Sequence, residues 1–166
     1  NGGADLDWDD GFSVGANVAK IFRKSAFNQN ISSWDISNLN SLNSMFDRAY
    51  SFNNGQPAGQ STAPLNSWDT SNVTNMYGMF GGANIFNQDI GEWDVSNVSN
   101  MNDMFFRWPA CDGGCARMIF DRDISSWCVQ QITSTPSGFN DNANTPIRAE
   151  YLPRWGESCG AKVILT

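Results

Sequence analysis

Apolar and polar residues recur along this chain in two short patterns that differ in period. The segment 90–95 alternates, with Trp93 and Val95 on one face and acidic residues on the other, which is the pattern of a short β-strand. Over 98–105 the apolar residues fall at i, i+3, i+6 and i+7, which fits one to two turns of helix. We therefore predict a strand followed by a short helix.

The two patterns belong to an internal repeat of 25 residues that is interrupted by insertions. Each copy contains a Trp that lies 12 residues before a Phe; the Trp residues are Trp34, Trp68, Trp93 and Trp127, and the Phe residues are Phe46, Phe80, Phe105 and Phe139. We place four repeats at 27–51, 52–85, 86–119 and 120–139, with insertions near 55–63 and 106–115. Residues 1–26 then form an N-terminal cap and half repeat, and 140–166 a C-terminal cap.

One unit of this size cannot bury its own apolar face, so successive units are expected to stack around a continuous core. The predicted fold is a single α/β repeat domain over 1–166, a short solenoid with one short strand and one short helix per coil. Asn38, Asn72 and Asn97 recur after the strand, and we expect their side-chain amides to bond backbone groups of the neighbouring coil.

The amino-acid composition argues against several classes of function. The 10 Lys and Arg residues against 17 Asp and Glu give a net charge of -7, which disfavours nucleic acid as a partner. The absence of His removes the commonest general base and metal ligand, so a non-enzymatic protein is expected. Apolar runs of only a few residues predict no transmembrane segment.

Several features favour an extracellular protein, secreted or held at the cell surface. The chain begins at Asn1 without a charged apolar leader, as a mature secreted product does, and it contains four Cys residues. Asn30, Asn72 and Asn97 each begin an N-x-S/T triplet and are candidate glycosylation sites, although such triplets also arise in any Asn-rich repeat.

The segments FNQDIGEWDVSNVSNMNDMF and FNQNISSWDISNLNSLNSMF resemble the BspA-like surface-protein repeat, a relative of leucine-rich repeats whose function is uncharacterised. The resemblance covers roughly 22–139, and the stretches 124–129 and 153–159 are similar to the closing segment of many members. It implies a leucine-rich-repeat-like architecture, an extracellular adhesion or scaffold role, and no known catalytic residues.

The four cysteines allow three pairings, and the sequence alone does not choose among them. We favour Cys111 with Cys115, which would knot the second insertion, and Cys128 with Cys159, which would pin the C-terminal cap onto the last repeat.

Candidate ligand-binding residues fall in three groups. Asp5, Asp7, Asp9 and Asp10 form an acidic run that resembles the start of a calcium loop, although it lacks the EF-hand Gly and final acid. Asp35, Asp69 and Asp94, with Glu92, are expected to align on the polar face, where they would bind a cation or a basic partner or serve as structural caps. Arg107 and Trp108 lie at the mouth of the second insertion, where the ring would stack on a sugar or a partner or pack beneath the loop.

We therefore expect a protein-interaction or structural assembly module without catalytic activity or an obligatory cofactor. It would bind a protein partner or associate with itself. A carbohydrate-binding adhesion module is the alternative, since the chain has surplus aromatic, Asn and Gln residues. A carboxylate-based glycosidase is a third hypothesis, which substitution of Glu92 would test.

Overall fold

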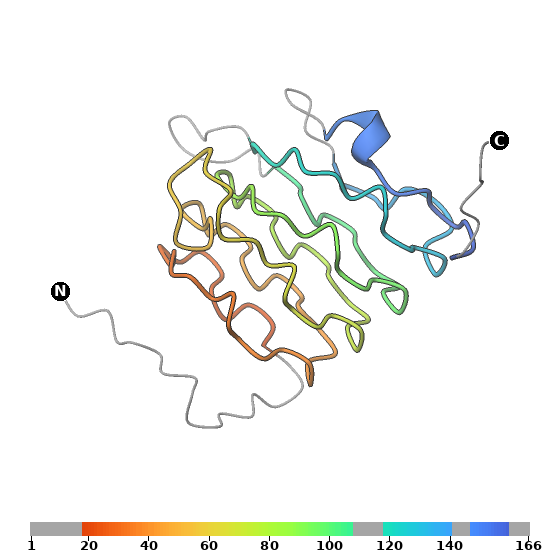
Figure 1. The fold of residues 1–166 in the computed structure, drawn as a ribbon, viewed down its shortest axis with the longest axis horizontal. Helices are drawn as coiled ribbons and strands as arrows, with labels where there is room; N and C mark the ends of the chain where they lie inside the picture. The colour runs from red at the N-terminus through yellow and green to blue at the C-terminus, as the bar shows by residue number, and fades with distance from the viewer. Residues whose placement is uncertain (1–17, 108–117, 141–146, 160–166) are drawn as a thin grey trace.

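The repeats stack as parallel coils, one behind the next along the molecule (Figure 1). The computed structural model describes residues 18–107, 118–140 and 147–159. Coils follow one another in chain order, and the C-terminal segment lies against the last of them (Figure 1). Equivalent residues of successive repeats therefore come into contact, which is what an internal repeat requires if it is to share one core.

Regular secondary structure is nearly absent from the described residues. They contain one 3-10 helix, η2 (Ala149–Tyr151), and two isolated parallel bridges, Ser41 with Asn75 and Asn75 with Asn100. The predicted α/β solenoid with a strand and a helix in each coil is therefore wrong, since neither a β-sheet nor an α-helix forms in this part of the chain. No helix among the described residues has the length and hydropathy of a membrane span.

Each coil is instead a succession of β-turns. In repeat 1 the amides of Met45, Ala49 and Phe52 each donate to the carbonyl three residues earlier, at 2.9–3.2 Å. Ser44 and Arg48, the third residues of two of these turns, have φ of 52° and 58°, the left-handed value that a type II turn requires. A turn begins and ends on an inward-facing residue, so consecutive turns space apolar residues by three or four, as a helix does. This shared spacing explains the incorrect helix prediction.

The turns leave alternate amides free to pair with the next coil. The amides of Leu42, Ser44, Phe46 and Arg48 donate to carbonyls of repeat 2 at 2.6–2.9 Å, and repeat 2 bonds to repeat 3 in the same way. Backbone groups are thus satisfied partly within a coil and partly between coils, without the extended strands that a sheet would need.

Three aromatic columns run through the core. One contains Phe22, Phe46, Phe80 and Phe105, and the second Phe27, Phe52, Phe86 and Phe120, with ring centroids 5.5–6.1 Å apart along each column. Trp68, Trp93 and Trp127 form the third, at 6.0 and 6.3 Å. Each of these three indole N–H groups donates to a buried carbonyl of the preceding repeat at 2.8–3.0 Å. Each fully buried ring contributes roughly 1.5–3 kcal/mol to stability.

The fourth repeat is out of register by one residue. In repeat 3, a turn ends at Val98 and the next begins at Met101, three residues later. The corresponding turns of repeat 4 end at Ile132 and begin at Pro136, four residues later. Phe139 therefore closes a turn at the place where the earlier repeats have a Met. Its distance of 12 residues from Trp127 predicts instead that it takes the place of Phe105.

The C-terminal segment closes the stack at this end. The ring of Phe139 meets Phe105 edge-on, at 88°, and Trp155 packs edge-on against Phe139 with centroids 5.0 Å apart. A disulfide joins Cys128 to Cys159, so the predicted attachment of the C-terminal cap to the last repeat is confirmed.

Candidate functional site

A charged hollow of about 430 Å³ lies where η2 meets the edges of repeats 3 and 4. Its ionisable groups are the carboxylates of Asp89, Glu92, Asp121 and Asp123 and the guanidinium groups of Arg122 and Arg148. Repeat 3 supplies the first two acids, repeat 4 the central residues, and the C-terminal segment Arg148. We call this site the charged hollow.

A ladder of side chains leads into the charged hollow. The residue after the first Phe of each repeat, which is Asn28, Asn53, Asn87 or Asp121, occupies the same place in its coil. The Asn28, Asn53 and Asn87 side chains each accept a hydrogen bond from the backbone N–H of the next residue in this series, at 2.8–3.1 Å. The ladder ends at Asp121, whose carboxylate would face the next coil if there were one.

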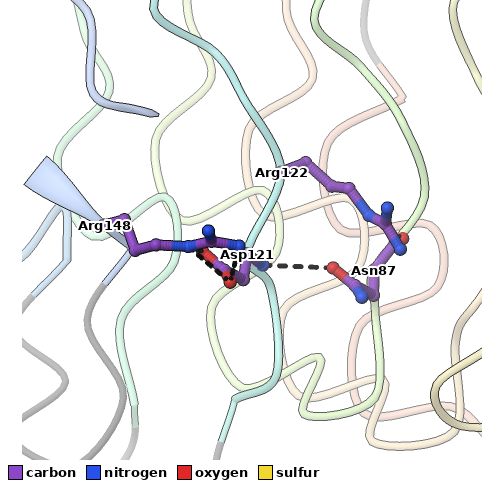
Figure 2. A network of polar contacts seen from close by, with 4 residues as sticks. All are labelled: Asn87, Asp121, Arg122 and Arg148. Atoms are coloured by element: carbon purple, nitrogen blue, oxygen red, sulfur yellow. Dashed lines mark hydrogen bonds and ion pairs between the residues drawn. The ribbon is translucent and has the colours of Figure 1, made fainter. Parts of the chain in front are cut away.

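Arg148 takes the place of that missing coil (Figure 2). Its Nε lies 3.1 and 3.0 Å from the two carboxylate oxygens of Asp121, and its Nη2 lies 2.7 Å from Oδ2. The hydrogen bonds from Arg148 lower the pKa of Asp121, and the same contact raises the pKa of Arg148. Arg148 also lies 4.2 Å from the ring centroid of Tyr151, a cation–π contact.

The remaining groups of the charged hollow are held to different degrees. Asp89 accepts the amide of Gly91 at 3.0 Å, and Arg122 Nε donates to the carbonyl of Asn87 at 2.9 Å. Hydrogen bonds from the Ser125 side chain and amide lower the pKa of Asp123. Glu92 is exposed, and its carboxylate has no partner among the described residues.

Taken together, the charged hollow presents four negative and two positive groups, and hydrogen bonds hold all of them except Glu92. An excess of two negative charges attracts a cationic group, while the two guanidinium groups offer a place for a carboxylate beside it. General acid catalysis would require a carboxyl that stays protonated near neutral pH. Asp121 and Asp123 have shifts in the opposite direction.

Comparison with family models identifies the relatives of this chain. Residues 7–58 and 55–149 match the model of a family described as "Mycoplasma protein of unknown function, DUF285". The chain belongs to the DUF285 family. No curated protein and no solved structure matches it. Membership assigns no activity, because the function of the family is unknown.

The aligned carboxylates of this DUF285 chain serve local turns. Asp35, Asp69 and Asp94 are exposed and occupy equivalent positions in three successive repeats. Each accepts the amide, at 3.0 Å, and the hydroxyl, at 2.6–2.7 Å, of the Ser two residues later. These bonds lower the pKa values of Asp35 and Asp69. The structural role weighed from the sequence is thus present, made within each coil rather than between coils.

The predicted calcium ligands Asp5, Asp7, Asp9 and Asp10 lie outside the described residues, as do Trp108 and the pair Cys111 and Cys115. Within the described ranges, no group of three or more Asp, Glu or Cys side chains is placed to hold a metal ion. Arg107, at the start of the second insertion, is half-buried and is not part of the charged hollow's lining.

The candidate glycosylation sites Asn30, Asn72 and Asn97 are all exposed in the DUF285 fold. The amide nitrogens of Asn72 and Asn97 donate to the carbonyls of Ser37 and Ser71 in the preceding repeat, each at 2.8 Å. The predicted bonding of this Asn column to the neighbouring coil is confirmed for these two residues. Glycosylation itself stays a prediction.

Among the predicted binding residues that the structure describes, Glu92 alone lines the charged hollow. Sequence reasoning missed Asp121, Arg122 and Arg148. The recurring Phe-Asn pair, which becomes Phe-Asp in repeat 4, was a signal for Asp121. No repeat pattern marks Arg148, since it lies in the cap beyond the last repeat.

Proposed function

We propose that this chain is a non-enzymatic binding module, whose charged hollow receives a cationic side chain of a protein partner or of a second copy. The observation that supports it is the gathering of four carboxylates and two guanidinium groups in one hollow at the edge of the stack, all but Glu92 held by hydrogen bonds. Since Arg148 and Arg122 are already held by Asp121 and Asn87, little side-chain entropy is lost when a partner binds.

The non-enzymatic part of the proposal rests on the state of the carboxylates. Glycoside hydrolysis needs one protonated carboxyl and one ionised carboxylate facing a common cleft. Hydrogen bonds keep Asp121 and Asp123 ionised, and Asp89 is already engaged by Gly91. Glu92 is exposed to solvent, whereas a general acid is kept protonated by burial in an apolar site.

We further propose that the module works outside the cell, as a surface or secreted interaction domain. Three features support this location: the likeness of the repeat to BspA-like surface proteins, the Cys128–Cys159 disulfide, and three N-x-S/T triplets whose Asn is exposed. A disulfide of this kind persists in an oxidising compartment.

The test combines two measurements on the whole chain. Light scattering after size exclusion, over a hundredfold concentration range, reports self-association. Fluorescence anisotropy with labelled tetralysine and tetraglutamate peptides reports the charge preference of the hollow. We expect tetralysine, but not tetraglutamate, to bind, with weaker binding at high salt.

The double variant Glu92→Gln with Asp123→Asn removes two charges from the hollow. The matched control, Asp35→Asn with Asp69→Asn, removes two charges of the same kind elsewhere on the stack. We expect at least a fivefold loss of tetralysine affinity, and of any self-association, in the first variant alone. Equal losses in both variants would mean that overall charge, rather than the hollow, binds the peptide. The proposal would also be wrong if the intact chain stayed monomeric and bound neither peptide.

A further inference from the structure

A second hollow, of about 430 Å³, lies between repeats 3 and 4 away from the charged hollow, and its lining carries no ionisable group. The polar side chains in it are those of Ser and Thr hydroxyls and Asn and Gln amides; they include Ser99, Asn102, Gln131, Thr133, Thr135 and Ser137. We call this site the neutral groove.

The extra residue of repeat 4 creates the neutral groove. Between repeats 2 and 3, the amide of Met76 donates to the carbonyl of Asn100 at 2.8 Å. The equivalent pair one repeat on is the Met101 amide and the Thr135 carbonyl, and the described residues show no such bond. The backbone hydrogen bonds between the two coils resume at Asp103, whose amide donates to the Ser137 carbonyl at 2.9 Å.

Side-chain bonds between coils stop over the same interval. Asn97 donates to the Ser71 carbonyl in the preceding repeat, but Gln131, which occupies the corresponding place, makes no such bond to Ser96 within the described chain. Ser99 donates its amide to the Thr74 carbonyl, whereas no bond in the described part of the molecule joins its own carbonyl to the next repeat. The carbonyls of Ser99 and Thr135, which belong to exposed residues, are therefore left for a ligand, whereas the Met101 amide is buried.

We propose that the neutral groove binds a neutral saccharide unit. Sugar hydroxyls both donate and accept, so they match a lining that mixes carbonyls, hydroxyls and carboxamides. The absence of ionisable groups gives no preference for acidic or basic ligands. The volume lies within the range of small-molecule sites.

The ends of the groove favour a short ligand over an extended peptide. The groove is lined by 99–102 of repeat 3 and 131–137 of repeat 4, and at one end of it the Asp103 amide holds the Ser137 carbonyl. A peptide that adds to a backbone edge pairs along several residues of that edge, whereas only four residues of repeat 3 line this groove.

Saturation-transfer NMR on the full chain tests this proposal. The probes are glucose, galactose, mannose and N-acetylglucosamine with their short oligomers, and glucuronic acid and sialic acid are the charged comparators. We expect saturation transfer to at least one neutral sugar and none to the acidic sugars. Transfer to none of the neutral sugars, or only to the acidic sugars, would overturn the proposal.

Three variants place any binding in the groove. Deletion of Ser134 removes the extra residue of repeat 4. The backbone hydrogen bonds between repeats 3 and 4 should then form without interruption, and the saturation transfer should vanish. Gln131→Leu should weaken binding at least fivefold, while Gln130→Leu, an exposed neighbour outside the lining, should leave it unchanged. Sugar binding that survives both the deletion and Gln131→Leu would overturn the assignment.

Hydrogen exchange supplies a readout that does not depend on any ligand. The Met101 amide should exchange at least tenfold faster than its counterpart Met76, which is bonded to the next repeat. Equal protection of the two amides in the free chain would mean that the Met101 amide is bonded to repeat 4 after all, and it would overturn the proposed gap in the backbone bonds between repeats 3 and 4. Because the Glu92 and Asp123 substitutions lie outside the groove, they should leave the sugar signal intact, so this proposal and the proposed function fail independently.

Discussion

Substitution of Gly78 by Ala distinguishes turns from helices by the sign of its effect. Gly78 is the third residue of a turn in repeat 2 and has φ of 57°. A Cβ built there would meet only the Ser44 hydroxyl at 3.4 Å, an ordinary van der Waals distance. Steric crowding therefore contributes little, and the effect of Gly78→Ala reports the backbone conformation.

A turn and a helix at this place predict changes of opposite sign in the free energy of unfolding for Gly78→Ala. At a left-handed position Ala costs roughly 1–2 kcal/mol relative to a relaxed backbone. In a helix, Ala would instead stabilise by about 0.8–1 kcal/mol relative to Gly. For a chain of this size each kcal/mol shifts Tm by about 2–4 °C. We expect Tm to fall by about 2–8 °C in Gly78→Ala, whereas a helix at this place would raise it.

Thermal unfolding followed by circular dichroism and calorimetry measures this shift. Lys24 provides the reciprocal test, because it is exposed and has φ of 57°. Lys24→Gly and Lys24→Ala remove the same charge, so the difference between them isolates the left-handed backbone. We expect the Gly variant to be more stable than the Ala variant by about 0.5–1 kcal/mol, after the entropic cost of Gly. A higher Tm for Gly78→Ala together with a more stable Lys24→Ala would refute the turn assignment.

Three other perturbations test other contacts. Replacing Cys128 and Cys159 with Ser opens a crosslink across 31 positions and should cost about 3–4 kcal/mol in chain entropy, seen as a lower urea midpoint. Trp93→Phe leaves a buried carbonyl of the preceding repeat without its donor and should cost about 1–3 kcal/mol, measured by the same denaturation. Arg148→Gln should lower the urea midpoint only slightly at pH 7, because both partners are about half exposed and the ion pair is screened by solvent. Arg148 lowers the pKa of Asp121, so the stability that this ion pair contributes is present above the unfolded-state pKa of the carboxyl and is lost as pH falls through its folded-state pKa. The Tm values of the wild type and of Arg148→Gln should therefore converge in acid. A Tm difference that does not change with pH would contradict this prediction.

The repeat and its columns are readable from the sequence because they depend on side-chain identity at fixed spacing. The Trp and Phe positions predict which rings stack, and Trp68, Trp93 and Trp127 do form a column. The Asn after the Ser of each motif predicts a bond between coils, and Asn72 and Asn97 make it. These features follow from stacking one copy on the next, whatever backbone conformation each copy adopts.

Backbone conformation is what the sequence does not determine here. Spacings of three and four suit a helix and a run of turns equally, and only Gly78 and Gly82, poor helix formers with φ of 57° and 73°, favoured turns. The charged hollow was not predictable because Arg148 reaches Asp121 from 27 residues away, from outside the repeat. The register shift in repeat 4 was also hidden, because Phe139 keeps the usual distance from Trp127.

A stack of this kind uses most of its polar groups internally, and this determines where it can bind anything else. In a regular coil, amides bond the next coil, Asn side chains bond carbonyls, and Asp carboxylates hold the turn beside them. The exposed faces of regular repeats thus have few unpaired groups that are also fixed in position. Both hollows occur where the regularity ends: one where the Asn ladder stops at Asp121, and the other where an added residue separates two coils. In this chain the two candidate ligand sites thus lie at irregularities of the repeat rather than along its regular columns.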